Sequence, residues 1–310
     1  MRAVALHLGL LALLFGLHFV LPDYHHGNLA RVMVLAAFAM GYNILFGYTG
    51  LLSLGHALFF AAGMYGTGLA VQHLGWGAGP ALVAGIAAGA VVSGMLALLA
   101  LRTSGVAFMI VTLMFAQAGA LTILHFSEIT GGDEGFVLPQ AGRMLWGLDL
   151  SDAGTRYLAA FVLFAVCLML CLWLVRTPFG RVLIAIRENE DRARMLGYDP
   201  FAHKFAAMVI SGTMAAAAGA AYGVLFGYVG ATFAEVQYSI LPLLYVLLGG
   251  AGTVLGPFIG TLFMFYLIDL SSDITTAHML IAGIALVLLT LFAPQGIMGE
   301  VRRRLWKGLP

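Results

Sequence analysis

The chain has 310 residues, of which 62% are apolar and 9% charged, and its 15 basic and 14 acidic side chains leave a net charge of +1. Because a soluble globular domain carries about 25% charged residues, this composition excludes a soluble enzyme or binding module and predicts a polytopic protein of the lipid bilayer. The nearly balanced charge also argues against a nucleic-acid partner.

A helix needs about 20 apolar residues to cross a bilayer, and we place ten spans on the apolar runs of this chain, of which the eighth is unusually short. They lie near residues 3–21, 29–47, 51–72, 79–101, 105–126, 156–176, 205–228, 239–250, 254–271 and 276–293. The first follows Arg2 and resembles a secretory signal, but its apolar run is long and no A-x-A site follows, so we interpret it as an uncleaved span. We therefore expect an all-α fold with about ten transmembrane helices in a single domain, residues 1–310.

The charged loops predict an orientation in the membrane. The loop at residues 127–155 is acidic, whereas the loop at 177–204 and the tail at 294–310 hold clusters of basic residues. Basic loops stay in the cytoplasm, so the loop 177–204, the tail and both termini are expected inside, and the loop 127–155 outside. Arg31 is the exception, at an outer helix end from which its side chain could reach the headgroups.

Five spans in each half would give the two halves opposite orientations. Residues 44–50 (ILFGYTG) end the second expected span and residues 224–230 (VLFGYVG) end the seventh. This similarity is typical of inverted repeats in transporters. A chance match between two glycine-rich membrane segments is the alternative.

Two glycine-rich stretches interrupt the apolar pattern, at residues 47–56 and 249–257. Interrupted helices often line substrate paths, so the expected path residues are Ser53, His56, Gly249, Gly252 and Thr253. For the glycines we favour the alternative of close helix packing, which explains most glycine in membranes. For the polar pair Ser53 and His56 both interpretations stay open.

The loop 177–204 holds nine of the chain's charged residues, so it must lie in water. Thr177 and Pro178 predict the start of one helix. A second, short helix should have Asn189 as its N-cap and Gly197 just beyond its end. A capped helix in a loop outside the membrane suggests that a partner protein binds it. The residues expected to make this contact are Arg187, Glu188, Asn189, Glu190, Ala193, Met195, Leu196 and Gly197. The alternative is a solvated connector that lies on the membrane surface.

The chain shows no motif for catalysis, for a metal or for a nucleotide. Its two lysines, Lys204 and Lys307, follow His203 and Trp306 rather than the glycine that a P-loop requires. No carboxylate lies near the middle of an expected span to drive an ion-coupled carrier. The energy for transport is therefore expected from another subunit, and a self-sufficient carrier or channel is the alternative.

Motifs spread from residue 41 to residue 299 resemble one family. They are Gly41-Tyr42-Asn43, residues 47–56, Thr112-Leu113, Phe115-Ala116-Gln117, Thr130-Gly131-Gly132, Gly180-Arg181, residues 185–190, Gly249-Gly250, Gly252-Thr253, Gly256-Pro257 and Pro294-Gln295-Gly296. Together they resemble the permease subunits of ABC importers for branched-chain amino acids, of the LivM type. The loop around Ala193 and Gly197 resembles the EAA loop that docks on the ATPase, although Asp191 stands in place of its Glu and Arg192 in place of its first Ala.

The resemblance implies a non-catalytic subunit of a bacterial inner-membrane complex, together with a second homologous permease, two ATPase subunits and a periplasmic substrate-binding protein. It implies the type II fold of vitamin B12 importers, in which two permeases enclose the path. ATP and Mg²⁺ would bind to the ATPases, and this chain would bind no cofactor. A branched-chain or related small amino acid is the implied substrate, and urea or another short amide is the alternative within the family.

Overall fold

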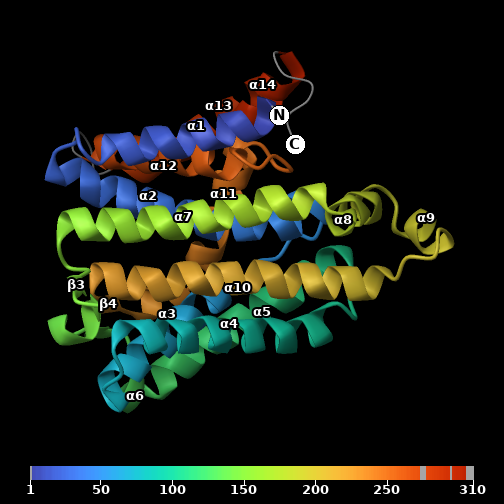
Figure 1. Cartoon of the computed structure of the whole chain (residues 1–310). Helices are drawn as coiled ribbons and strands as arrows, with labels where there is room; N and C mark the ends of the chain where they lie inside the picture. Colours follow the sequence, from blue (N-terminus) through green and yellow to red (C-terminus); the bar gives the residue numbers. More distant parts are fainter. Residues whose placement is uncertain (1, 273–276, 294, 305–310) are drawn as a thin grey trace.

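Helices form most of the structure, a computed structural model that describes residues 2–272, 277–293 and 295–304. In these residues ten helices overlap the ten predicted apolar runs, and most of them lie side by side (Figure 1). They are α1 (Arg2–Leu17), α2 (Asp23–Asn43), α3 (His56–Leu74), α4 (Ala78–Ala100), α5 (Gly105–His125), α7 (Ala153–Arg176), α10 (Pro200–Phe226), α11 (Val236–Gly249), α12 (Gly256–Ser272) and α13 (His278–Phe292).

Five segments in the described residues are long and apolar enough to cross a membrane, by length and composition. They are Tyr24–Tyr48, α4, α5, α7 and α10, whereas α1, α11 and α12 contain shorter apolar helices. The predicted polytopic membrane architecture is therefore confirmed. The start of the third span was predicted wrongly, because Gly50 adopts a left-handed backbone (φ +79°) and α3 begins only at His56.

Two helices, α2 and α10, form the centre of the bundle. In their most apolar stretches 89% and 61% of the residues are buried, against 28% in α4 and 22% in α5. Figure 1 shows α10 between α7 on one side and α3 and α4 on the other. The exposed residues of α4 and α5 are mainly aliphatic, as expected of surfaces that face lipid or another apolar partner.

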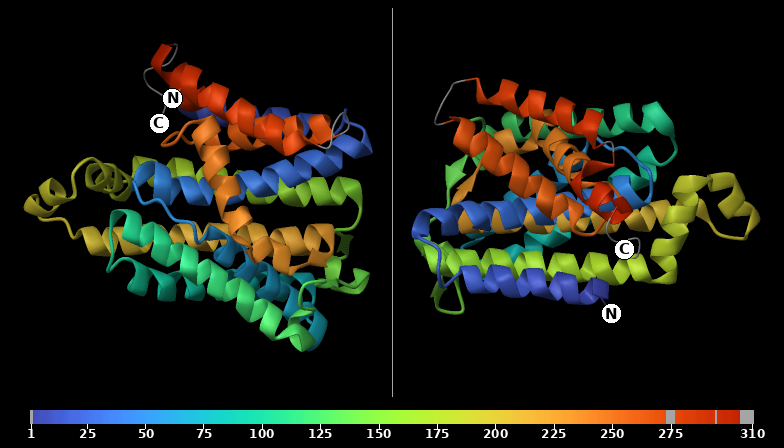
Figure 2. Two further views of the ribbon diagram at one scale, coloured as in Figure 1. Left: turned by 180° about the vertical axis from the view of Figure 1, so that it is seen from behind. Right: turned by 90° about the horizontal axis from the view of Figure 1, so that it is seen from above.

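In each of the two predicted halves, helices pack against the central helix of the other half. α3 and α4 of the first half pack against α10 of the second, and α11 and α12 of the second pack against α2 of the first. α2 and α10 also pack on each other. α11 runs across the direction of the long helices (Figure 2). The similar segments at 44–50 and 224–230 differ locally, since α2 continues into a π-helical turn, η1 (Ile44–Tyr48), whereas α10 ends at Gly227 (φ +73°).

Two loops lie at opposite ends of the bundle (Figure 1). One end carries α6 (Ser127–Thr130), η2 (Gln140–Arg143), η3 (Ala231–Ala234) and two antiparallel strand pairs, β1 (Phe136–Val137) with β4 (Tyr228–Val229) and β2 (Met144–Leu145) with β3 (Leu148–Asp149). The other end carries α8 (Pro178–Glu188) and α9 (Glu190–Met195). α14 (Gly296–Arg304) completes the described part of the C-terminal segment.

The placement of these loops predicts the outcome of cysteine labelling. A membrane-impermeant thiol reagent applied to intact spheroplasts should modify Asp149→Cys and should spare Arg192→Cys and Arg303→Cys until the membrane is permeabilised. The native thiols, Cys167 and Cys171, are 4% exposed and give little background. Labelling of Arg192→Cys in intact spheroplasts would show that the orientation predicted from the charged loops is wrong.

Candidate functional site

A partly buried non-helical segment, residues 49–55, joins the π-helical turn after α2 to the start of α3. Neighbouring side chains bind its free backbone groups. The Leu54 N–H donates to Thr112 Oγ1 (3.1 Å), and the Tyr42 hydroxyl donates to the Ser53 carbonyl oxygen (3.1 Å). Irregular backbone at membrane depth is tolerated where the surrounding protein satisfies it, and this segment meets that condition.

Ser53 and His56 lie inside the protomer, and both are 0% exposed. The Ser211 hydroxyl donates to the Gly41 carbonyl oxygen (2.6 Å), so it accepts a hydrogen bond from His56 Nε2 (2.8 Å). His56 Nδ1 is then the acceptor for the Ser53 hydroxyl (3.3 Å). Neither side chain reaches the protomer surface, so the pair borders no open path in this structure, and its expected place on the substrate path stays a prediction. The pair fixes the start of α3 against α10.

A second non-helical segment joins α11 to α12, and its glycines bring two backbones into contact. A Cβ atom on Gly249 would lie 1.7 Å from the Gly256 carbonyl oxygen, so no side chain fits there. Gly250 and Gly252 adopt φ angles of +117° and +74°. Thr253 Oγ1 donates to the Gly250 carbonyl oxygen (2.7 Å) and accepts from the Gly256 N–H (3.1 Å). Close packing accounts for Gly249 and Gly256, as we favoured from the sequence.

The Asn43 side chain joins the end of α2, just before the π-helical turn and the first non-helical segment, to the second non-helical segment. Its Nδ2 donates to the Thr253 carbonyl oxygen (2.9 Å), and its Oδ1 accepts from the Gly252 N–H (2.9 Å). Asn43 is 2% exposed, so both bonds are shielded from water. Gly47 permits this approach, because a Cβ atom there would lie 1.9 Å from Asn43 Oδ1. Sequence reasoning noted Asn43 only within a motif, although a lone amide one helical turn before a glycine was a signal for such a contact.

Arg187, in the last turn of α8, connects the loop 177–204 to the same place. Its Nη1 donates to the Gly47 carbonyl oxygen. Its side chain also passes Gly50 and Gly252, where added Cβ atoms would lie 2.9 Å from Arg187 Cγ and 3.2 Å from Arg187 Nη1. The structure places the Arg187 guanidinium against Gly47 and Gly252 of its own chain while the residue stays exposed, so the expected contact of Arg187 with a partner stays a prediction.

A polar cavity of about 530 Å³ lies beside this contact. The residues that line it are Arg187, Leu247, Ala251, Thr253, Gln295, Gly299, Arg302 and Arg303. Thr253, an expected path residue, therefore borders an open space at the end of the bundle that carries α8. The cavity supplies cationic and amide donors next to the junction of the two segments.

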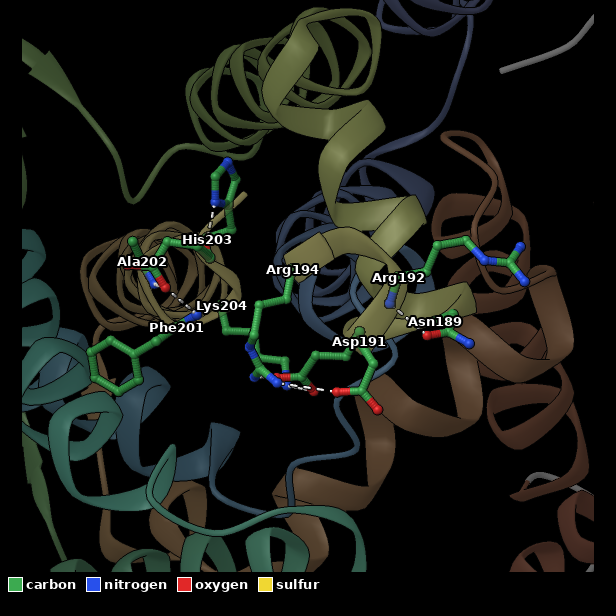
Figure 3. A network of polar contacts seen from close by, with 10 residues as sticks. Asn189, Asp191, Arg192, Arg194, Phe201, Ala202, His203 and Lys204 are labelled. Carbon is green, nitrogen blue, oxygen red and sulfur yellow. Dashed lines mark hydrogen bonds and ion pairs between the residues drawn. The ribbon is translucent and has the colours of Figure 1, made fainter. Parts of the chain in front are cut away.

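The helices of the loop 177–204 begin and end as predicted. Thr177 caps α8, and Asn189 caps α9 by accepting from the Arg192 N–H (2.8 Å; Figure 3). Gly197 follows α9 with a φ angle of +87°, in the left-handed region that favours glycine. Asp199 then caps α10. Local capping rules thus determine where both helices lie in the sequence.

The apolar face of α9 differs from the expected one. Ala193 is 1% exposed and packs against Val182 and Ile186 of α8, so it holds α9 in place and is not free to enter a groove on a partner. Met195 and Leu196 are 85% and 70% exposed. Figure 1 shows α9 standing beyond the ends of the long helices. The exposed apolar surface of α9 therefore consists of Met195 and Leu196.

Acidic residues on α9 bind cations of the same loop. Glu190 pairs with Lys204 and with Arg194 (3.4 Å), and Asp191 pairs with Arg194 (3.1 Å; Figure 3). Glu190 thus links α9 to the start of α10, whereas Glu188 is exposed. Surface pairs of this kind contribute little to stability, so their main effect is to fix the direction of α9.

Residues 26–291 match the family described as branched-chain amino acid transport system / permease component. The high-affinity branched-chain amino acid transport system permease protein LivM of Escherichia coli (strain K12) is 31% identical over 301 residues, which cover 88% of this chain and 69% of that protein. The corresponding LivH protein of Escherichia coli (strain K12) is 25% identical over 285 residues, 86% of this chain and 91% of that protein. No solved structure matches the chain.

The contact made by Asn43 predicts an effect on stability. Asn43→Ala leaves the Gly252 N–H and the Thr253 carbonyl oxygen buried without their partner, at a cost of about 1–3 kcal/mol for each group. The midpoint temperature of unfolding of the purified protein in detergent should fall by several degrees. Asn28→Ala, which removes one hydrogen bond to Asp269 (3.2 Å), is the control and should lower it less. Equal effects of the two substitutions would contradict the role of Asn43.

Proposed function

This chain belongs to the branched-chain amino acid transport system permease family and is a transport permease component rather than an enzyme, and we propose that it forms half of the translocation path of an ATP-driven importer for branched-chain or related small amino acids. A second homologous permease would supply the other half of the path. Two ATPase subunits would supply the energy and bind ATP with Mg²⁺, and a periplasmic binding protein would deliver the substrate.

The proposed membrane arrangement has ten crossings in two inverted halves of the type II fold. The exchanged packing of α3 and α4 on α10 and of α11 and α12 on α2 supports it, because inverted repeats place equivalent helices in equivalent surroundings. In this arrangement the loop 177–204, the tail and both termini face the cytoplasm of a bacterial cell, and the loop 127–155 faces the periplasm.

The observation that carries the proposal is the exposed pair Met195 and Leu196 on α9, outside the bundle. Two large apolar side chains in water indicate a surface that a partner covers. We propose that they insert into a groove on the ATPase, with Glu188 and Asn189 at the rim. A displacement of α9 then moves α8, with which it shares the buried contact of Ala193, and Arg187 carries the displacement to Gly47 and to the junction of the two non-helical segments.

The proposal predicts what happens when the two exposed apolar residues, Met195 and Leu196, are replaced by charged ones. Burial of a large apolar side chain is worth roughly 1.5–3 kcal/mol, so the double variant Met195→Asp, Leu196→Asp should weaken binding of the ATPase more than tenfold. Retention of the ATPase on membranes and ATP-dependent uptake of leucine, with binding protein present, should both fall. The exchange Met195→Leu, Leu196→Met keeps the apolar area and should leave both unchanged.

Normal retention and normal uptake in the aspartate variant would contradict the coupling role of α9. Uptake of leucine by the wild-type chain without ATP, ATPase or binding protein would instead indicate a self-sufficient carrier or channel, and would overturn the proposed function itself.

Arg187→Ala should separate docking from transport. The variant keeps the exposed surface of α9, so the ATPase should stay bound and continue to hydrolyse ATP, while uptake falls because α8 has lost its contact with Gly47. Arg181→Ala is the matched control, since Arg181 is an equally exposed arginine on the same helix and does not take part in the contact with Gly47. Uptake in Arg187→Ala equal to that in Arg181→Ala would show that force does not pass through this contact.

A further inference from the structure

Arg31 is the one exposed position in a long buried part of α2. Every other residue from Asn28 to Leu45 is buried. Arg31 lies eight residues into the helix, or about 12 Å along its axis. A guanidinium at this depth is costly if it faces lipid, so Arg31 must face water or a polar group. Its Cζ atom lies 5.1 Å from the centre of the Phe226 ring, at the end of α10.

Two further arginines gather around the same end of α10. Arg156 Cζ lies 5.7 Å from the centre of the Phe226 ring. Arg143 donates from Nε to the Val224 carbonyl oxygen and from Nη2 to the Leu225 carbonyl oxygen (both 2.7 Å). Burial lowers the pKa of Arg143, and the neighbouring Arg156 lowers it further, against a smaller opposing effect of Asp149. Three positive charges therefore share this small region.

Asp149 lies near Arg143 and Asp152 lies near Arg156, so the group of Arg31, Arg143 and Arg156 has only these partial countercharges among the residues that the structure describes. None of the ion pairs found there involves any of the three. Arg156 Nη2 donates to the Ser151 carbonyl oxygen (2.5 Å), but Arg156 Nε is buried without a hydrogen-bond partner among those residues. A donor kept away from water and left unpaired indicates a place for an acceptor that binds from outside.

Aromatic rings stand next to the arginines. The Phe226 ring lies 4.6 Å from that of Tyr222, which lies 5.1 Å from that of Phe233, and Phe233 lies 4.9 Å from Tyr238. All four rings are only partly buried, and they come from α10, η3 and α11. The region therefore combines guanidinium groups with apolar surface, which suits an anion that carries an apolar side chain.

We propose that Arg31 and Arg156, on the Phe226 ring, bind the carboxylate of the transported amino acid at the outer end of the path. This inference rests on the proposed function for its substrate class. Arg143 acts as a positioning residue, since it holds the last turn of α10 and thereby Phe226. An acidic side chain of the binding protein is the other source of a carboxylate. The depth of Arg31 and the buried Nε of Arg156 favour a small molecule that enters the bundle.

The first experiment uses the complete complex in proteoliposomes, with ATP and saturating leucine-loaded binding protein. Arg31→Gln and Arg156→Gln should each lower the uptake of leucine at least tenfold, and Arg31→Lys should keep part of it. The affinity of the binding protein for the complex should stay within twofold of wild type. Arg102→Gln, an exposed arginine at the opposite end of the bundle, is the control. Normal uptake in the glutamine variants, or a loss of binding-protein affinity that explains the loss of uptake, would overturn the proposal.

A second experiment tests the site by thiol labelling, without measuring transport. In the assembled complex, Tyr222→Cys should react faster with an anionic than with a cationic methanethiosulfonate reagent, relative to a free thiol in solution. Arg31→Gln should lower that ratio at least threefold, and millimolar leucine should slow the reaction while leucinamide, which has no carboxylate, should not. If the ratio of the two labelling rates is the same in Arg31→Gln as in the wild-type residue background, the proposed site is wrong, while the proposed function still stands. Charge-selective labelling that depends on Arg31, in a complex that imports no amino acid, would overturn the proposed function and leave the anion site standing.

Discussion

The bidentate contact of Asn43 with Gly252 and Thr253 is the constraint on which the interior of the protein depends. It joins the end of α2 to the place where the pair α11–α12 gives up regular helix, and it satisfies two backbone groups that this second segment does not pair within itself. Glycine at positions 47, 249 and 256 is required because the backbones approach so closely that no Cβ atom fits. The amide and the glycines thus form one joint, in which a change on either side alters the other.

One side chain connects this joint to the α8–α9 unit at the end of the bundle. Arg187 reaches from α8 to the Gly47 carbonyl oxygen, and α8 carries α9 through the small contact of Ala193 with Val182 and Ile186. The α8–α9 unit is also held to the bundle by Leu183, which is buried in the main core, by the Phe179 ring, which stacks on His203, and by the pairing of Glu190 with Lys204. The α8–α9 unit contacts the Asn43 joint through Arg187 at one end and carries exposed apolar side chains at the other. It can pass a displacement inward without unfolding, because the helices on either side of it stay packed.

Sequence reasoning succeeded where the determinants are local. The apolar runs located the helices, and Thr177, Asn189 and Gly197 located the ends of α8 and α9, since each acts on backbone groups within four residues. It failed where a partner far along the chain decides. The burial of Ala193, the contact of Arg187 with Gly47 and the late start of α3 depend on contacts between different helices, up to 155 positions apart, which periodicity does not report. The importance of Arg31 was likewise hidden, because an arginine near a helix end normally needs no explanation.

The exchange of contacts between the two halves has a consequence for biosynthesis. When the ribosome has completed residues 1–126, α3 and α4 have no α10 to cover them, and α2 still lacks α7, α10, α11 and α12. The candidate membrane spans of this half, Tyr24–Tyr48, α4 and α5, are therefore made while their future interior surfaces, including the Asn43 amide and the Arg31 guanidinium, are unmatched. Folding of this chain must wait for its second half, so the nascent protein depends on the insertion machinery to shelter those polar groups until α12 has been made.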